Sequence, residues 1–405
     1  MNCSREEVLQ YVQEEDVRFV RLALCDVYGK QKNVSITPDE LPRAFEHGIA
    51  FDASSIAGFG NEDRSDLFLH PDPQTLILLP WRPEHGKVVR MFADITYPDG
   101  TPFECDTRTL LKKAVADAGT AGYTFAFGIE QEFYLFKLDD EGHPTRVPCD
   151  QAGYMDMAPD DKGENVRREI CLMLEQMGIC PESSHHEDGP GQNEIDFRYA
   201  DALTTADTAQ TFQTAARIVA QQNGFEADFS AKPLGGQPGN GFHINMSVQP
   251  EHDGTAMRSM IAGVLRRIAE ISVFLNPTED SYKRFGQSRA PIHISWSEEN
   301  RSQLIRIPAA TGQYRRAELR SPDPTANPYL GLTLMIYAGL EGITEQAELP
   351  PAVNANLFTA EKEVLEKLKR LPESLVRARR AADESSFVRQ YIPGSIIDIY
   401  CGQDR

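Results

Sequence analysis

The chain has 405 residues, enough for two domains or one large one. Its formal net charge of -20 argues against nucleic acid and anionic membranes as partners, because both need basic surfaces. Its seven cysteines are scattered without a Cys-x-x-Cys pair, which excludes a disulfide framework and a zinc cluster and indicates a cytoplasmic protein.

The first hundred residues predict a small sheet with a helix across it. Ser4 and Glu7 form a capping box for a short helix, with no sign of a signal peptide before it. Strands are predicted over 17–24, 31–36, 75–79 and 88–95, and a helix start with proline in its first turn over 37–40. Pro98 to Pro102 reads as a boundary, so we predict domains at 1–100 and 101–405.

Helices and strands alternate beyond that boundary. A long strand is predicted over 123–136, and helices over 107–118, 165–177, 205–222, 257–274 and 329–343. The long strand alternates with period two, which puts Glu130 and Glu132 on the face opposite Phe127, Ile129 and Phe133. Two neighbouring carboxylates on such a strand indicate either a solvent-facing side or a site for a cation.

A second acidic pair flanks a turn. Glu187 and Glu194 lie on either side of Gly189-Pro190-Gly191, which should fold the chain back and bring the two carboxylates together. A solvated acidic loop is the alternative, but two such pairs favour a site for a hard divalent cation, which prefers oxygen ligands. His185 and His186 flank the same turn.

A glycine-rich segment covers 232–243. It lacks the Gly-Lys-Ser/Thr ending of a P-loop and the third glycine of a dinucleotide fingerprint, so a hairpin turn is the plain interpretation. The strand after it puts His243, Asn245 and Ser247 on one face. Because the chain carries two acidic pairs, His243 becomes a stronger candidate for a metal ligand.

Arginines gather late in the chain. Arg316, Glu318 and Arg320 share one face of a predicted strand, and Arg301 and Arg306 lie just upstream. A salt-bridged surface strand is one interpretation. Because the arginine fork suits phosphate and carboxylate, the combination with metal-type carboxylates also suits ATP-dependent phosphoryl transfer without a Walker motif.

These residues fall in motifs that identify a family. The chain resembles type I glutamine synthetases over nearly its whole length. The matching segments are 51–56, 128–133, 185–197, 232–243, 276–284, 300–302 and 318–324.

The resemblance implies an α+β fold, with an N-terminal β-grasp domain and a C-terminal catalytic domain built on a curved antiparallel sheet flanked by helices. It also implies that ATP phosphorylates the γ-carboxylate of glutamate and that ammonia displaces the phosphate to give glutamine. The expected cofactors are roughly two or three Mg²⁺ or Mn²⁺ ions per active site.

The resemblance also assigns roles by position. Glu132, Glu187 and Glu194 would bind one metal ion, and Glu130, His243 and Glu318 a second. The residues expected at glutamate are Arg284, Arg320 and Gly239; those at ATP and its phosphates are Arg301, Arg306, Arg316, Asn245 and Ser247; the catalytic set is Asp52, Ser55, Tyr154 and Arg301.

In the family, Asp52 and Ser55 reach the site from a neighbouring subunit. The resemblance therefore implies a homo-oligomer with active sites at subunit interfaces, of the stacked hexameric-ring kind. The expected partners are small molecules: glutamate, ATP, and ammonia or an amine.

Four positions depart from the family pattern. Pro238 replaces an asparagine, Phe358 replaces the tyrosine that some members adenylylate, and the chain from Glu384 onward differs from the usual C-terminal helices. Arg289 stands where the flap carries a glutamate. A positive charge there would repel ammonium by about 4 kcal/mol at about 4 Å and an effective dielectric of about 20. The alternatives are thus a γ-glutamyl ligase for another amine or amino-acid acceptor, and a catalytically weak regulatory homologue.

Overall fold

The computed structural model describes residues 3–60, 64–82, 85–251, 254–287, 289–310, 312 and 315–402. The chain forms two compact units, one of Met1–Leu110 with Cys171–Cys180 and one of Leu111–Ile170 with Pro181–Arg405. The fold is α+β, as the sequence predicts.

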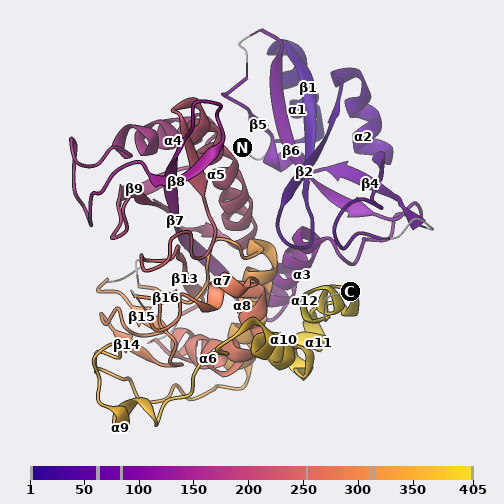
Figure 1. The fold of residues 1–405 in the computed structure, drawn as a ribbon. Coiled ribbons are helices and arrows are strands. Elements are labelled where there is room, and N and C mark those ends of the chain that lie inside the picture. Colours follow the sequence, from indigo (N-terminus) through magenta and orange to yellow (C-terminus); the bar gives the residue numbers. More distant parts are fainter. Residues whose placement is uncertain are drawn as a thin grey trace. The chain divides into compact units, whose positions relative to one another are not determined.

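The N-terminal unit is a mixed sheet with short helices (Figure 1). Its strands are β1 (Val17–Cys25), β2 (Gln31–Ile36), β3 (Ile49–Asp52), β4 (Asp66–Pro71), β5 (Ile77–Leu78) and β6 (Lys87–Thr96), and its helices are α1 (Arg5–Glu14) and α2 (Leu41–His47). The path β2-β1-β6-β4-β3 has one parallel pair, β1 with β6. This arrangement is the β-grasp architecture.

Most of the predicted N-terminal elements are present. The capping box of Ser4 and Glu7 starts α1, and β2 has the predicted bounds. The strand expected over 75–79 is shorter, because Pro73–Thr75 forms a 3-10 turn capped by Asp72, leaving only Ile77–Leu78 extended. The end of α4 (Glu164–Gln176) joins this unit, since Met177 packs with Leu79 and Val88.

The larger unit contains a ten-stranded sheet among the described residues, with path β14-β15-β16-β13-β7-β10-β9. Its main strands are β7 (Thr124–Leu138), β9 (Pro181–His186), β10 (Gln192–Phe197), β13 (Phe242–Gln249), β14 (Trp296–Glu298), β15 (Ile305–Ile307) and β16 (Ala317–Leu319). Short strands β8 (Pro144–Pro148), β11 (Ala200–Asp201) and β12 (Phe225–Asp228) pair with β7. The long β7 is thus the strand to which most of the sheet is attached.

Helices pack against this sheet and against one another (Figure 1). The long ones are α3 (Thr107–Thr120), α5 (Ala202–Gln222), α6 (Thr255–Leu275) and α8 (Pro328–Thr344), followed by α10 (Leu375–Asp383), α11 (Ser386–Tyr391) and α12 (Gly394–Cys401). Helices α6 and α8 approach closely: a Cβ on Gly263 would lie 2.0 Å from the carbonyl oxygen of Ala338. The described helices are too short or too polar to cross a membrane.

Candidate active site

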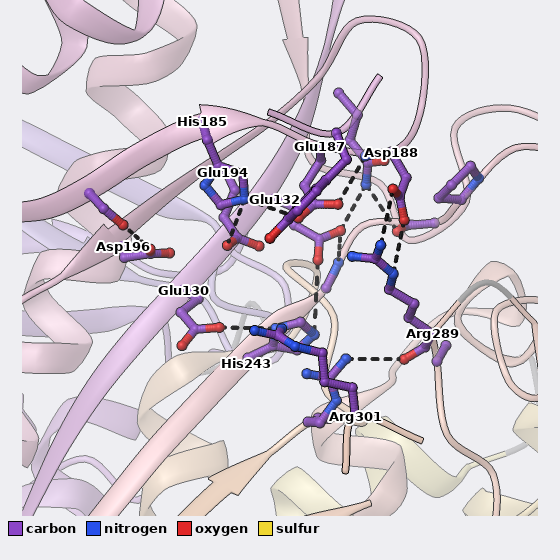
Figure 2. A pocket seen from close by; sticks show the side chains of 18 of the residues that line it. Glu130, Glu132, His185, Glu187, Asp188, Glu194, Asp196, His243, Arg289 and Arg301 are labelled. Carbon is purple, nitrogen blue, oxygen red and sulfur yellow. Dashed lines mark hydrogen bonds and ion pairs between the residues drawn. The ribbon is translucent and has the colours of Figure 1, made fainter. Parts of the chain in front are cut away.

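A cavity of about 350 Å³ lies within the larger unit, lined by polar side chains of several strands. The strands β7, β10 and β13 run side by side, and their register sets the cavity floor. Glu132 lies opposite Glu194 on β10, and Glu130 lies opposite His243 on β13. The period-two alternation of β7 turns both glutamates to the same face, so four ionisable side chains meet there (Figure 2).

The predicted turn closes a hairpin between β9 and β10. The amide of Glu187 donates to the carbonyl of Gln192 over 2.8 Å, and Gly191 takes φ +68°, which glycine adopts without strain. Glu187 and Glu194 consequently lie on either side of His185, whose Nε2 is 3.1 Å from Glu187 Oε1 and 3.7 Å from Glu194 Oε1. The sequence-based interpretation that the turn brings these two glutamates together agrees with this geometry.

Two groups of potential ligand atoms share Glu194. In one, Glu130, Glu194 and His243 offer atoms within 4.8 Å of one another, and in the other His185, Glu187 and Glu194 do so. Glu132 joins them through His243 Nε2, at 3.9 Å. The division into two sets of three ligands drawn from the resemblance stays a prediction.

Electrostatics in the cluster are dominated by burial and mutual repulsion. Burial raises the pKa of Glu194 well above its ordinary value, and the charges of Asp196 and Glu132 raise it further. Burial and the charge of Glu187 likewise raise the pKa of Glu132. Burial also opposes ionisation of Glu130, but the hydrogen bond and charge of His243 outweigh it and hold the pKa of Glu130 at about 2. Crowded carboxylates beside imidazole nitrogens fit a hard divalent cation.

Glycines of the 232–243 segment let its backbone approach the cluster. A Cβ on Gly241 would lie 2.7 Å from His243 Nε2 and 2.8 Å from Glu132 Oε1. The amide of Gly241 donates to Glu132 Oε2 over 2.9 Å. A Cβ on Gly239 would lie 2.5 Å from the carbonyl oxygen of Ala231. Neither position accepts a larger residue without displacing cavity groups.

Buried arginines face the carboxylates. Arg284 and Arg320 line the cavity with side chains only 3% and 2% exposed. The Nε atom of each is buried with no hydrogen-bond partner among the described residues. Arg284 donates to the carbonyl of Ser321 over 3.1 Å, which fixes its outer end. Two fixed cations with unused donors suit a ligand that carries carboxylates.

Glu318 lies among arginines. It is fully buried on β16, accepts a hydrogen bond from Arg306 Nε, and accepts one from Arg320 Nη1 over 2.7 Å. Its Oε1 is 3.8 Å from His243 Nδ1. The structure therefore brings Glu318 beside the cluster while pairing it with two guanidinium groups, and its role as a metal ligand stays a prediction.

The other residues predicted to contact phosphate lie in or beside the cavity. Arg301, Arg306 and Arg316 line the cavity. Asn245 donates to Glu130 Oε1 over 2.8 Å and accepts from Arg316 Nε over 2.9 Å. Asn245 and Ser247 lie on β13 with His243, but neither is among the described residues that line the cavity.

Tyr154 and Arg289 form one wall of the cavity. The guanidinium carbon of Arg289 lies 4.8 Å from the centre of the Tyr154 ring, and the Tyr154 ring meets His185 edge-on at 5.4 Å. Arg289 also forms an ion pair with Asp188, with 3.0 Å between Nε and Oδ2. Arg289, which departs from the family pattern, thus faces the cavity, but its charge is paired with that of Asp188.

Asp52 and Ser55 belong to the N-terminal unit. Asp52 is the last residue of β3 and is exposed, and its Oδ1 accepts a hydrogen bond from the amide of Ser54 over 2.9 Å. Hydrogen bonds from Ser54 lower the pKa of Asp52. Their assignment to a neighbouring subunit's site stays a prediction.

Sequence reasoning passed over several residues of the cavity. The resemblance puts His185 at no ligand position, and its Nε2 lies 3.1 Å from Glu187 Oε1 and 3.7 Å from Glu194 Oε1. Gln192 donates to Glu132 Oε2 over 2.8 Å. Asp188 and Asp196 also line the cavity. The signal available for all four was their place in the polar hairpin that carries Glu187 and Glu194.

Both units match known families. Residues 16–98 match the family described as glutamine synthetase, beta-Grasp domain, and residues 104–405 match glutamine synthetase, catalytic domain. The glutamine synthetase of Clostridium saccharobutylicum is 42% identical over 412 residues, covering 98% of this chain and 93% of the relative. That of Methanosarcina mazei is also 42% identical over 412 residues, covering 98% and 92%.

Similar solved structures agree. The complex of GmaS with ADP in conformation 1 has a TM-score of 0.88 at 27% identity and covers 99% of this chain and 94% of that one. GmaS without ligand has a TM-score of 0.86 at 27% identity, covering 97% and 93%.

Proposed function

Because the chain belongs to the glutamine synthetase family, we propose that it is an ATP-dependent ligase that forms glutamine from glutamate and ammonia through a γ-glutamyl phosphate intermediate. The observation that carries the proposal is a single cavity in which a carboxylate–histidine cluster faces several arginines. Phosphoryl transfer needs mainly this kind of positioning and charge neutralisation.

The proposed reaction has two steps. An oxygen of the γ-carboxylate of glutamate first attacks the terminal phosphorus of ATP, and ADP leaves. The acceptor nitrogen then attacks the acyl carbon, phosphate leaves with the transferred oxygen, and the nitrogen loses a proton. The protein must therefore hold glutamate, orient ATP and accept an amine beside the acyl phosphate.

Arg284 and Arg320 are the residues proposed for glutamate. Each is buried and lines the cavity, its Nε has no hydrogen-bond partner in the part of the chain that the structure describes, and the backbone of Gly239 lies beside Arg284. Their guanidinium groups would orient the amino-acid carboxylate and hold the γ-carboxylate toward ATP.

Arg301, Arg306 and Arg316 are proposed to contact the phosphates, with Asn245 and Ser247 behind them on β13. These charges would stabilise the phosphoryl group during transfer. Arg306 would exchange its contact with Glu318 for one with phosphate.

The cluster is proposed to hold the divalent cations that the family uses. Its residues are Glu130, Glu132, Glu187, Glu194, His243 and Glu318. Roughly two or three Mg²⁺ or Mn²⁺ ions bound there would neutralise phosphate charge. The oxygen-rich donor set with imidazole suits both ions, and Mn²⁺ tolerates the nitrogen ligand better.

The acceptor is proposed to bind near Tyr154, with Asp52 and Ser55 supplied by an adjacent subunit. Tyr154 is a partly exposed residue of the cavity wall, which leaves room for such a contribution. The proposal therefore includes a cytoplasmic homo-oligomer, with hexameric rings as the expected form.

An amine acceptor in place of ammonia is the second candidate. The observation that favours it is Arg289 on the cavity wall. The candidate shares every step except the identity of the attacking nitrogen.

The test is phosphate release from ATP with glutamate and Mg²⁺ or Mn²⁺, measured with ammonium, methylammonium and amino acids, with products identified by mass spectrometry. We expect glutamine with ammonium, and Glu187→Gln should abolish it. Glu182→Gln is the control, because Glu182 is an exposed residue of β9, the strand that ends just before Glu187. Turnover only with another amine would select the second candidate, and no turnover despite bound ATP would support a regulatory homologue.

A further inference from the structure

We propose that Asp188 and Arg289 form a charge-neutral acceptor gate, in which Asp188 cancels the charge of Arg289 so that a cationic amine can reach the site. The inference rests on the proposed ligase function and names the residues that select the acceptor by charge. It reverses the expectation that an isolated cation at position 289 repels ammonium.

The ion pair between these residues has a fixed orientation. Arg289 Nε lies 3.0 Å from Asp188 Oδ2, and Nη2 donates to Oδ1 over 3.2 Å (Figure 2). Two parallel hydrogen bonds between a guanidinium and a carboxylate fix direction as well as distance. The side chains remain 42% and 32% exposed, so an incoming ion can reach them.

Tyr154 supplies a third side of the gate. The guanidinium carbon of Arg289 is 4.8 Å from the ring centre, within the range where an aromatic face attracts a cation. A carboxylate and an aromatic face together are the elements that bind organic ammonium ions. Arg289 contacts both, so an alkylammonium acceptor can exchange with it there.

The backbone holds Arg289 at this place. Its φ is +66°, a conformation that non-glycine residues adopt only when the surroundings impose it. The amide of Gly286 donates to the carbonyl of Ala290 over 2.8 Å, and the carbonyl of Arg289 accepts from Arg320 Nη2 over 3.4 Å. The gate is thereby joined to an arginine proposed to hold glutamate.

The gate stands where two cavities adjoin. Arg289 and Arg301 line both the 350 Å³ cavity and a neighbouring one of about 570 Å³. The wall of the neighbouring cavity also contains Glu298, Asn300, Asn356 and Phe358. An acceptor that crosses from one to the other passes the pair.

Charge sets what the gate admits. With Asp188 ionised, the pair sums to zero, so it does not repel an incoming cation. With Asp188→Asn the shape is kept but Arg289 is left unpaired, which repels ammonium and methylammonium. With Arg289→Gln the free carboxylate of Asp188 attracts them.

The test compares a cationic acceptor with hydroxylamine, which is largely uncharged at neutral pH and traps the acyl phosphate as a hydroxamate. We expect Asp188→Asn to raise the ratio of KM for ammonium to KM for hydroxylamine by about fivefold, with the change shrinking in high salt. Arg289→Gln should lower that ratio. The KM ratio of the double variant should return close to that of wild type, because the two charges act as a pair and removing both leaves the gate neutral.

Equal changes with both acceptors, or a double variant that keeps the shifted ratio of either single variant, would overturn the gate and leave a structural role only. If the wild-type protein forms no hydroxamate from ATP and glutamate, the ligase proposal itself fails. If hydroxamate forms and the KM ratio is unmoved in Asp188→Asn, the gate alone fails.

Discussion

Glu194 on β10 lies opposite Glu132 on β7 in the antiparallel register, and both carboxylates are buried. Like charges directly opposite on neighbouring strands destabilise a sheet. The repulsion between these two carboxylates therefore lowers the stability of the metal-free sheet, and a cation bound there would restore it.

Replacing Glu194 separates these two effects. Glu194→Gln removes a repelled carboxylate, so the metal-free protein should gain about 1 kcal/mol in free energy of unfolding. The same change should weaken the stabilisation by Mn²⁺ and lower ligase activity by about a hundredfold. Thermal unfolding in EDTA and in Mn²⁺ measures the change in unfolding free energy and the stabilisation by Mn²⁺, with Glu182→Gln as the control. If Mn²⁺ stabilised the variant as much as wild type, Glu194 would not be a metal ligand.

Asp196 gives the metal-free protein a pH dependence. Burial, with the charge of Glu130, raises the pKa of Asp196 from 3.8 to about 6. The folded state therefore binds this proton more tightly than the unfolded state, so stability is greatest below about pH 4 and falls as pH rises toward about 6. Asp196→Asn should exceed wild type by about 1–3 kcal/mol at about pH 7 and by little at about pH 4.

Urea denaturation in EDTA at the two pH values checks this. Asp160→Asn, at an exposed position, is the control and should show no such difference. An equal advantage of Asp196→Asn at both pH values would mean that packing, not ionisation, is responsible.

Gly241 tests how tightly the cluster is positioned. A Cβ there would lie within 2.8 Å of both His243 and Glu132, so Gly241→Ala should displace them and lower kcat by about tenfold to a hundredfold. Gly235→Ala in the same segment is the matched control, since nothing lies within 4 Å of its Cβ. Similar kinetics in the two variants would contradict the positioning role.

Co-expression of two inactive variants tests the shared site. Asp52→Ala and Glu187→Gln should each be inactive, whereas mixed assemblies should recover about one quarter of wild-type activity if adjacent subunits contribute the two residues. The tagged mixed species would be purified before assay. Inactive mixed assemblies would place both residues in a site within one subunit.

The sequence predicted what local patterns determine. The alternation around Glu130 and Glu132 gave the strand and its polar face, and Gly189-Pro190-Gly191 gave the hairpin that joins Glu187 to Glu194. The order of motifs identified the family and hence the fold.

Contacts between distant segments were beyond local patterns. Asp188 and Arg289 are 101 residues apart, and nothing in either segment specifies the other. The pairing of Glu318 with Arg306 follows from the register of β15 with β16, which tertiary packing sets. The shortened β5 reflects a turn in which Asp72 and Pro73 outweigh the strand preference of the residues after them.

The central claim is that the γ-carboxylate of glutamate attacks ATP. Glutamate labelled with oxygen-18 in that carboxylate would be incubated with the protein, ATP, Mn²⁺ and ammonium, and the released phosphate analysed by mass spectrometry. If the γ-carboxylate attacks ATP, each phosphate that accompanies glutamine or another γ-glutamyl product will carry one labelled oxygen. Unlabelled phosphate released together with such a product would contradict it.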